Sequence, residues 1–232
     1  MRSEYAHYLK TQDVMDIILE KYKNQEFDAN GNVALYGVSF LVDKDVMFHK
    51  PNESYIERES EWYKSMSLNV YDIPGKVPKI WKDVAAEDGT IISNYGWMLF
   101  SEENGNQFRN AMRAIKKDPN TRQAIAIFMR PSMHKEWNKD GRWDFCCTYN
   151  YNFQYDLATN ELNLIVNMRS NDAATGFTND VAWAKEVWRM AQKELCAEEG
   201  TLIWRADNFH VYPRSFHELD EYIEKHNLKG EK

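Results

Sequence analysis

Three segments of strand type follow one another in the second half of the chain with no helical pattern between them, and this order constrains the fold most. They are Gln123–Met129, Asp144–Tyr155 and Leu162–Arg169, all rich in aromatic and β-branched residues. The polar stretch Asp156–Glu161 joins the last two as a hairpin-like turn. No strand is followed by a glycine-rich phosphate loop, so the pattern excludes a Rossmann site and a P-loop.

Helical patterns flank these strands. They cover Asp13–Lys23, Ser54–Met66, Ser101–Lys117 (opened by Ser101 as a cap) and Asp180–Leu195. Two further strands are indicated, Val33–Val42 after the turn Asn30-Gly31-Asn32, and Thr201–Val211. The pattern predicts an α+β fold, with a mixed or antiparallel sheet and helices packed against one side. No repeat or linker divides the chain, so we expect one domain over residues 1–232.

Composition narrows the classes of function. The chain has 29 basic and 36 acidic residues, a net charge of −7, and no long Lys/Arg block. A general DNA- or RNA-binding role is therefore not expected, although a few arginines can still gather around a small anion. No apolar run approaches the ~20 residues of a membrane-spanning helix, and Met1–Lys10 does not resemble a signal peptide. We expect a cytoplasmic protein that does not enter a membrane.

The cysteines offer one candidate nucleophile. There are 3, at Cys146, Cys147 and Cys196, which is a poor disulfide framework, and no zinc-binding spacing accompanies them, so no metal is expected. Taken alone, Cys147 is more readily interpreted as a small buried hydrophobe. A nucleophilic role requires a thiolate, which a cation such as Arg169 at the end of the adjoining strand would favour.

Other polar residues have structural interpretations when each is taken alone. Arg169-Ser170-Asn171-Asp172 reads as a solvated strand end, and Asn179-Asp180 as a helix N-cap. His210-Val211-Tyr212 closes a strand, where a core histidine and an interface tyrosine would explain the pattern.

The order and spacing of these residues resemble the thymidylate synthase family. That family has a Cys, then Arg-Ser-x-Asp, then a Gly with Asn four positions on, then His-x-Tyr. The chain matches these elements at Cys147, Arg169–Asp172, Gly176, Asp180 and His210–Tyr212. Matches upstream are Glu59-x-x-Trp62, Ile80-Trp81, Tyr95-Gly96 and Asp118-Pro119-Asn120-Thr121-Arg122, so the resemblance covers roughly residues 33–216.

Within this family the chain is similar to the viral deoxycytidylate hydroxymethylases. The segments that carry this likeness include Glu61–Ser65, Asp72–Gly75, Ser93–Trp97, Arg130–Met133, Asn167–Asp172 and Asn179-Asp180. The resemblance implies transfer of a one-carbon unit from 5,10-methylenetetrahydrofolate to C5 of dCMP, with water as the final acceptor. It also implies a homodimer whose two subunits share each active site.

Catalytic and base-reading roles follow from the resemblance. Cys147 would add to C6 of the pyrimidine, while Glu59 and Tyr95 would organise proton transfers through water. Asp180 stands where thymidylate synthases have Asn. A carboxylate there would accept from the 4-amino group of cytosine and repel O4 of uracil, which favours dCMP over dUMP. A one-residue slip would align Asn179 instead, but the following Val181-Ala182 favours Asp180.

Binding roles are implied for the remaining matches. Arg169 and Ser170 would hold the 5′-phosphate, helped by Arg122 from the partner subunit, since Arg pairs bidentately with phosphate. His210 and Tyr212 would hold the deoxyribose 3′-hydroxyl. Three residues would bind the folate. Asp172 would contact its pterin ring, Trp81 would lie beside it, and Gly176 would complete the set.

The chain departs from the family pattern at the phosphate. The family places Arg or Lys near Asn30-Gly31-Asn32, where this chain has no basic residue, and it reads Arg-Arg where this chain has Arg122-Gln123. Either Lys21 or Lys23 compensates, or the phosphate is held less tightly.

The sequence also bears on the product of the reaction and leaves alternatives for the class of protein. Only 20 residues follow Tyr212, ending in Lys229-Gly230-Glu231-Lys232, so no long C-terminal lid is expected over the folate. A wetter site favours the 5-hydroxymethyl product. The alternatives are a dCMP or dUMP 5-methyltransferase and a catalytically silent nucleotide-binding relative.

Overall fold

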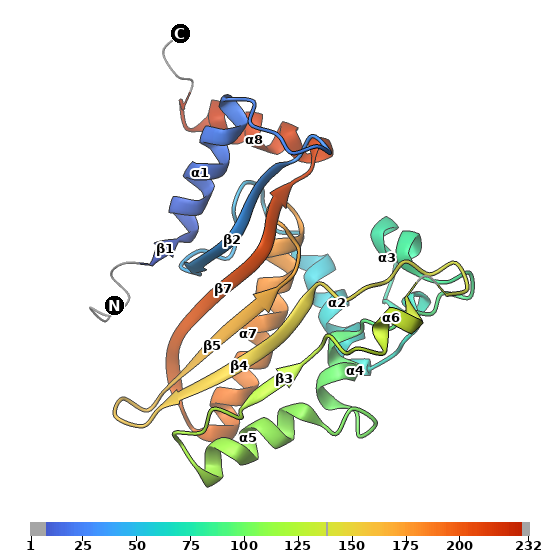
Figure 1. Cartoon of the computed structure of the whole chain (residues 1–232), viewed down its shortest axis with the longest axis vertical. Coiled ribbons are helices and arrows are strands. Elements are labelled where there is room, and N and C mark those ends of the chain that lie inside the picture. Colours follow the sequence, from blue (N-terminus) through green and yellow to red (C-terminus); the bar gives the residue numbers. More distant parts are fainter. Residues whose placement is uncertain (1–7, 138, 229–232) are drawn as a thin grey trace.

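The computed structural model describes residues 8–137 and 139–228 (Figure 1). Its strands are β1 (Leu9–Lys10), β2 (Val33–Leu41), β3 (Ile125–Ile127), β4 (Thr148–Asp156), β5 (Glu161–Met168), β6 (Asn171–Asp172) and β7 (Glu198–Val211). Its α-helices are α1 (Thr11–Lys23), α2 (Glu53–Ser65), α3 (Lys79–Val84), α4 (Tyr95–Phe100), α5 (Gln107–Lys117), α6 (Met133–Glu136), α7 (Gly176–Leu195) and α8 (Phe216–Lys225). Short 3₁₀ turns cover Val70–Asp72 and Pro213–Ser215.

The strands form one mixed sheet in the order β1-β2-β7-β5-β4-β3, with β6 paired to β7 off this path. Strand β7 lies at its centre, antiparallel to β2 and parallel to β5. The β4–β5 hairpin closes where Asp156 pairs with Glu161, at the predicted turn. The predicted α+β fold with a mixed sheet is confirmed.

The sheet buries one face against α7, which runs behind β5 and β4 in Figure 1. The pattern of β5 explains why one face of the sheet is buried, because its residues alternate strictly between buried and half-buried positions. Those on the buried face are Leu162, Leu164, Val166 and Met168. Helix α7 meets them with a stripe that includes Phe177, Val181, Val187 and Trp188. Each such side chain contributes about 1.5–3 kcal/mol to folding, so this layer holds the end of β5 in place.

Two predicted helix starts were wrong by about four residues or more, and the strands expected from Asp144 and Thr201 begin at Thr148 and Glu198. The helix expected from Ser101 begins at Gln107, because residues 101–106 form turns and Asn106 is the N-cap, accepting from the backbone N–H of Arg109 at 3.2 Å. The helix expected from Asp180 begins at Gly176, which places Asp180 one turn inside it. The interpretation of Asp180 as an N-cap is therefore wrong. Glycine has a low helix propensity, which hides this earlier start in the sequence.

Two further predictions concern membrane-spanning segments and the two ends of the chain. In the described part of the chain, no helix combines the length and apolar character that crossing a membrane requires. Most of the segment Met1–Lys10 and the last residues, Lys229–Lys232, lie outside the described residues.

Candidate active site

Cys147 lies directly before β4, at the point where β5 ends beside it. The backbone N–H of Arg169 donates to the carbonyl of Cys147 at 2.8 Å. The Arg169 side chain turns back onto the same segment, where Nε donates to the carbonyl of Cys146 at 2.9 Å and Nη2 to that of Phe145 at 2.8 Å. Its Nη2 lies 3.7 Å from Sγ of Cys147. The strand pairing therefore fixes a permanent cation beside the thiol.

The surroundings of the two adjacent thiols differ. Burial raises the pKa of Cys147 to about 11, Arg169 opposes this rise, and the carboxyls of Asp180 and Asp144 add to it. Cys146 is buried, and its Sγ donates to the carbonyl of Thr148 at 3.1 Å. Burial raises the pKa of Cys146 further still, and no cation opposes the change. Cys147, which is half-buried and next to Arg169, is therefore the more easily ionised thiol of the pair.

A hydrogen-bonded carboxyl group stands on α2. Glu59 is buried, and it accepts from the hydroxyl of Tyr55 and, at 2.9 Å, from Nε1 of Trp81. Burial raises the pKa of Glu59, while its two donors lower it. Tyr55 lies one helical turn before Glu59, a spacing that the sequence shows but that our sequence analysis missed.

Tyr95 joins this group from α4. Its hydroxyl accepts from Oγ1 of Thr148, the residue after Cys147, at 3.0 Å. Burial raises the pKa of Tyr95 well above its ordinary value, and the nearby Cys146, Cys147 and Asp180 add to this. Since Asp180 is also within electrostatic reach of Glu59 and Cys147, the predicted catalytic residues lie in one neighbourhood.

Asp180 is fixed by a residue that the sequence analysis did not single out. Asn171 donates from Nδ2 to Oδ2 of Asp180 at 2.7 Å, and its own Oδ1 accepts from Nε1 of Trp204 at 3.0 Å. Burial raises the pKa of Asp180 well above its ordinary value, the charge of Glu59 adds to the rise, and Asn171 opposes it. The family pattern leaves position 171 unspecified, so the motif itself carried no signal for this contact.

Gly176 brings the start of α7 close to two carboxyl side chains. A Cβ on this residue would lie 3.3 Å from Cβ of Asp172 and 3.7 Å from Oδ2 of Asp180. Asp172 is held by Thr175, whose Oγ1 donates at 2.8 Å, and by the N–H of Ala174 at 3.0 Å. A side chain at position 176 would therefore crowd Asp172 and lie against Asp180.

The end of β7 carries His210 and Tyr212. The His210 ring lies 4.4 Å from that of Tyr212, and its Nδ1 contacts Oδ1 of Asn208 at 2.9 Å. Its buried Nε2 has no hydrogen-bond partner among the residues that the structure describes, so a polar ligand atom would satisfy it. Burial lowers the pKa of His210, which favours the neutral ring. Strand β6 brings Asp172 opposite His210 in the sheet.

Arg122 is the predicted site residue that this chain keeps away from Cys147. It is exposed, just before β3, and the pairing of Ile125 with Asn152 directs it toward the Tyr155 end of β4. Cys147 lies before the other end, so about eight residues at ~3.3 Å each, or roughly 25 Å, separate the two. Ser170, by contrast, follows Arg169 directly and is half-buried.

The lysines considered as phosphate ligands have other partners. Lys21 pairs with Glu26 at 2.7 Å, and Lys23 donates to the carbonyl of Leu228 at 2.6 Å. The turn Asn30-Gly31-Asn32, which has no basic residue, does lie beside the site. A Cβ on Gly31 would lie 3.5 Å from Cγ of Pro213, the residue after Tyr212.

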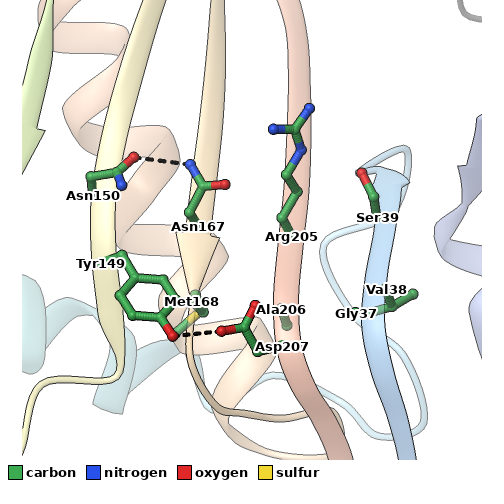
Figure 2. A pocket seen from close by; sticks show the side chains of 10 residues that line it. All are labelled: Gly37, Val38, Ser39, Tyr149, Asn150, Asn167, Met168, Arg205, Ala206 and Asp207. Atoms are coloured by element: carbon green, nitrogen blue, oxygen red, sulfur yellow. Dashed lines mark hydrogen bonds between the residues drawn. The ribbon is translucent and has the colours of Figure 1, made fainter.

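A shallow hollow of about 360 Å³ lies on the other face of the sheet, which turns away from α7 (Figure 2). Its residues come from β2, β4, β5 and β7, and they are Gly37, Val38, Ser39, Tyr149, Asn150, Asn167, Met168, Arg205, Ala206 and Asp207. Two hydrogen bonds span it, from Tyr149 to Asp207 and from Asn167 to Asn150. None of the predicted site residues lines this hollow.

No group of three or more His, Cys, Asp and Glu within residues 8–137 and 139–228 could hold a metal ion.

Comparison with known proteins gives one consistent family. The thymidylate synthase family model matches residues 41–231. The chain is 41% identical over 227 residues to the deoxycytidylate 5-hydroxymethyltransferase of Enterobacteria phage T6, covering 91% of this chain and 92% of that protein. For the enzyme of the same name from Enterobacteria phage T4 the values are 42% over 211 residues, 87% and 85%.

More distant relatives share the fold. The thymidylate synthase of Fusobacterium nucleatum is 26% identical over 240 residues, covering 95% of this chain and 84% of that protein. The structure of thermostable thymidylate synthase A from Bacillus subtilis superimposes with a TM-score of 0.68 at 21% identity, covering 93% of this chain and 84% of that one.

Proposed function

The chain belongs to the thymidylate synthase family, and we propose on that premise that it is a deoxycytidylate 5-hydroxymethyltransferase. Its reaction would convert dCMP, 5,10-methylenetetrahydrofolate and water into 5-hydroxymethyl-dCMP and tetrahydrofolate. The observation that carries the proposal is the buried carboxyl of Asp180, which lies within electrostatic reach of Cys147, Glu59 and Tyr95.

Cys147 is the proposed nucleophile. A bond from Sγ to C6 of cytosine would turn C5 into a carbon nucleophile, and the same bond breaks at the end of the reaction. The free thiol holds its proton, since its pKa is about 11. Arg169 favours the thiolate, and neutralising Asp180 by protonation removes a charge that opposes it.

Glu59 and Tyr95 are the proposed proton-transfer groups. Both are buried, and the pKa of each is raised, which suits a carboxyl that takes up and releases a proton and a phenol that keeps its proton. Glu59 receives two hydrogen bonds, from Tyr55 and Trp81, which hold its carboxyl in one orientation. It can therefore position a water molecule at C5 and at the exocyclic carbon.

Nucleotide binding would use the ends of β5 and β7. Arg169 and Ser170 would contact the 5′-phosphate, and His210 with Tyr212 the 3′-hydroxyl. The buried Nε2 of His210, which lacks a partner among the described residues, supports this assignment, because a sugar hydroxyl would satisfy it.

The residues around the start of α7 fit a folate. Gly176 opens the space between Asp172 and Asp180 that a Cβ would fill, and Trp81 lies beside Glu59. Bound 5,10-methylenetetrahydrofolate supplies a one-carbon unit at the oxidation level of formaldehyde. Asp172, Gly176 and Trp81 would bind and orient it, with the carboxylate of Asp172 as the hydrogen-bond acceptor for the pterin ring.

We also propose that the protein works as a homodimer with composite sites. Arg122 is exposed and roughly 25 Å from Cys147 within one chain, so it can serve a phosphate only in another subunit. The side of β7, β5 and β4 that carries the hollow has no helix across it in Figure 1, and it offers a surface on which a second copy can pack.

Product analysis tests the proposed function. The protein is incubated with methylenetetrahydrofolate and either dCMP or dUMP, and the nucleotide mass and the folate species are measured together. We expect 5-hydroxymethyl-dCMP with stoichiometric tetrahydrofolate, and far less turnover of dUMP. Dihydrofolate with a 5-methyl nucleotide would show a methyltransferase instead. A 5-fluoro pyrimidine nucleotide that forms no covalent complex, together with no turnover, would indicate a silent relative.

A further inference from the structure

Trp204, Asn171 and Asp180 form a line of two hydrogen bonds that leads from the core to the site. Trp204 is fully buried on β7, Asn171 is buried on β6, and Asp180 lies on α7. The indole Nε1 donates to Oδ1 of Asn171 at 3.0 Å, and Nδ2 of Asn171 donates to Oδ2 of Asp180 at 2.7 Å. The proposed roles of the family motif use Asp180 and leave Trp204 and Asn171 without one.

The indole N–H of Trp204 fixes the orientation of the Asn171 side-chain amide. An indole N–H can donate but never accept, so only the oxygen of the Asn171 amide can face it. The amide nitrogen must then face Asp180. A rotated amide would leave the indole N–H unsatisfied in a buried place, which costs more than the net value of a hydrogen bond. Phe177 packs edge-on against Trp204 at 5.4 Å and holds the indole in position.

The fixed amide makes the two oxygens of Asp180 unequal. Oδ2 accepts from Asn171 and must present a lone pair in that direction. When the carboxyl carries a proton, the proton is therefore placed on Oδ1. The raised pKa of Asp180, due mainly to burial, favours this protonated form.

This asymmetry matters because a free carboxylic acid does not distinguish the two bases. Cytosine presents an acceptor at N3 and a donor at its 4-amino group, whereas uracil presents a donor at N3 and an acceptor at O4. A carboxylic acid has one donor and one acceptor, and it pairs with either edge if its proton can move between the two oxygens. Discrimination by the protonated carboxyl therefore requires that one oxygen be kept as the acceptor.

We propose that Trp204 is a positioning residue for base selection, which acts through Asn171 by fixing which oxygen of Asp180 carries the proton. The proposal rests on the proposed function, since it assigns a selectivity device to the same nucleotide site. It predicts that base selectivity depends on an indole N–H that contacts no substrate atom.

The test compares Trp204→Phe with Trp188→Phe. Both residues are buried tryptophans that each donate one hydrogen bond, and that of Trp188 goes to the carbonyl of Leu162 at 2.8 Å, away from Asp180. Binding of dCMP and of dUMP is measured by titration calorimetry, and kcat and KM are measured for both nucleotides. We expect Trp204→Phe to lower the preference for dCMP at least about 10-fold, mainly through KM, because a mispaired buried polar group is what excludes the wrong base. Trp188→Phe should keep the wild-type preference.

Asn171→Ala gives a second route that leaves the core tryptophan intact, and it should lower the preference to a similar extent. An unchanged preference in a folded Trp204→Phe protein, or an equal loss in Trp188→Phe, would overturn the proposal. If Trp204→Phe does not fold, an unchanged preference in Asn171→Ala would overturn it as well. Wild-type protein that binds dCMP no better than dUMP would remove the selectivity itself, whereas wild-type binding preference without turnover would count against the proposed function alone.

Discussion

The guanidinium of Arg169 lies 3.7 Å from Sγ of Cys147 while two of its nitrogens hold the carbonyls of the segment that carries the thiol. The backbone of the segment that carries Cys147 thereby holds the cation in place. Its effect on the thiol is electrostatic, and it works against the burial that keeps Cys147 protonated.

The two adjacent cysteines should respond differently to serine. Cys147→Ser is expected to lower kcat by roughly 10³-fold or more in a folded protein, since a hydroxyl is a far weaker nucleophile than a thiolate. Cys146→Ser should remain active, because a serine hydroxyl can donate to the carbonyl of Thr148 as the thiol does. Release of tetrahydrofolate measures both variants, and equal activities would exclude covalent catalysis by Cys147.

The ionisation of Cys147 should depend on Asp180. Iodoacetamide reacts with the thiolate, so the alkylation rate should rise with pH through a midpoint near 11. Asp180→Asn removes a negative charge that disfavours the thiolate, and the midpoint should fall by about one pH unit. Arg169→Ala removes the cation and should raise it. The measurement uses a Cys146→Ser, Cys196→Ser background with one reactive thiol, and an unchanged midpoint in both variants would contradict this electrostatic picture.

Asp180→Asn should also change the preferred base. Asn171 donates toward position 180, so the new side chain would turn its amide oxygen to Asn171 and its NH₂ group to the base. That group suits O4 of uracil and opposes the 4-amino group of cytosine. We expect the kcat/KM ratio of dCMP to dUMP to fall at least about 100-fold. Wild-type preference for dUMP would refute the assignment of Asp180.

Subunit mixing tests the composite site. Arg122→Ala should raise the KM for dCMP with little change in Tm, because the side chain is exposed. Mixed with inactive Cys147→Ser protein, it should recover activity, since each mixed dimer contains one site with both native residues. Labelled subunits must be shown to exchange. Exchange without recovery would mean that Arg122 does not act across the interface.

Gly176→Ala should affect folate more than nucleotide. The added methyl group would lie 3.3 Å from Cβ of Asp172, in the space proposed for the pterin. The KM for methylenetetrahydrofolate should rise several-fold or more, while the Kd for dCMP stays within about 2-fold of the wild type. A selective loss of dCMP binding would move Gly176 out of the proposed folate site.

Periodicity predicted three of the longer elements well. Helix α1, helix α2 and strand β2 were each expected to within about two residues, since their buried positions recur at helical or strand spacing. Short elements such as α3 and α4, with 6 residues each, contain too few repeats for periodicity to detect. The strand expected at Gln123–Met129 is shorter, because only Ile125–Ile127 pairs with β4.

The site was predicted as a set of residues but not as a network. Arg169 beside Cys147 followed from two neighbouring strand ends, which is local information. The contact between Trp204 and Asn171 joins β7 to β6 across 33 positions, and no spacing rule connects an indole to an amide at that distance in the chain. Such contacts depend on the three-dimensional register of the strands, which one sequence does not reveal.

The central place of β7 couples the integrity of the site to the folding of the whole chain. This strand pairs with β2 at Val33–Val211 and with β5 at Met168–Ala206, and it carries both Trp204 and His210. These pairings join distant parts of the chain, so they form slowly and open only when the sheet as a whole opens. The backbone amides of Trp204 and His210 should therefore be among the last to exchange with deuterium. A molecule with an intact site is one in which β2, from the first third of the chain, already pairs with β7, from the last third.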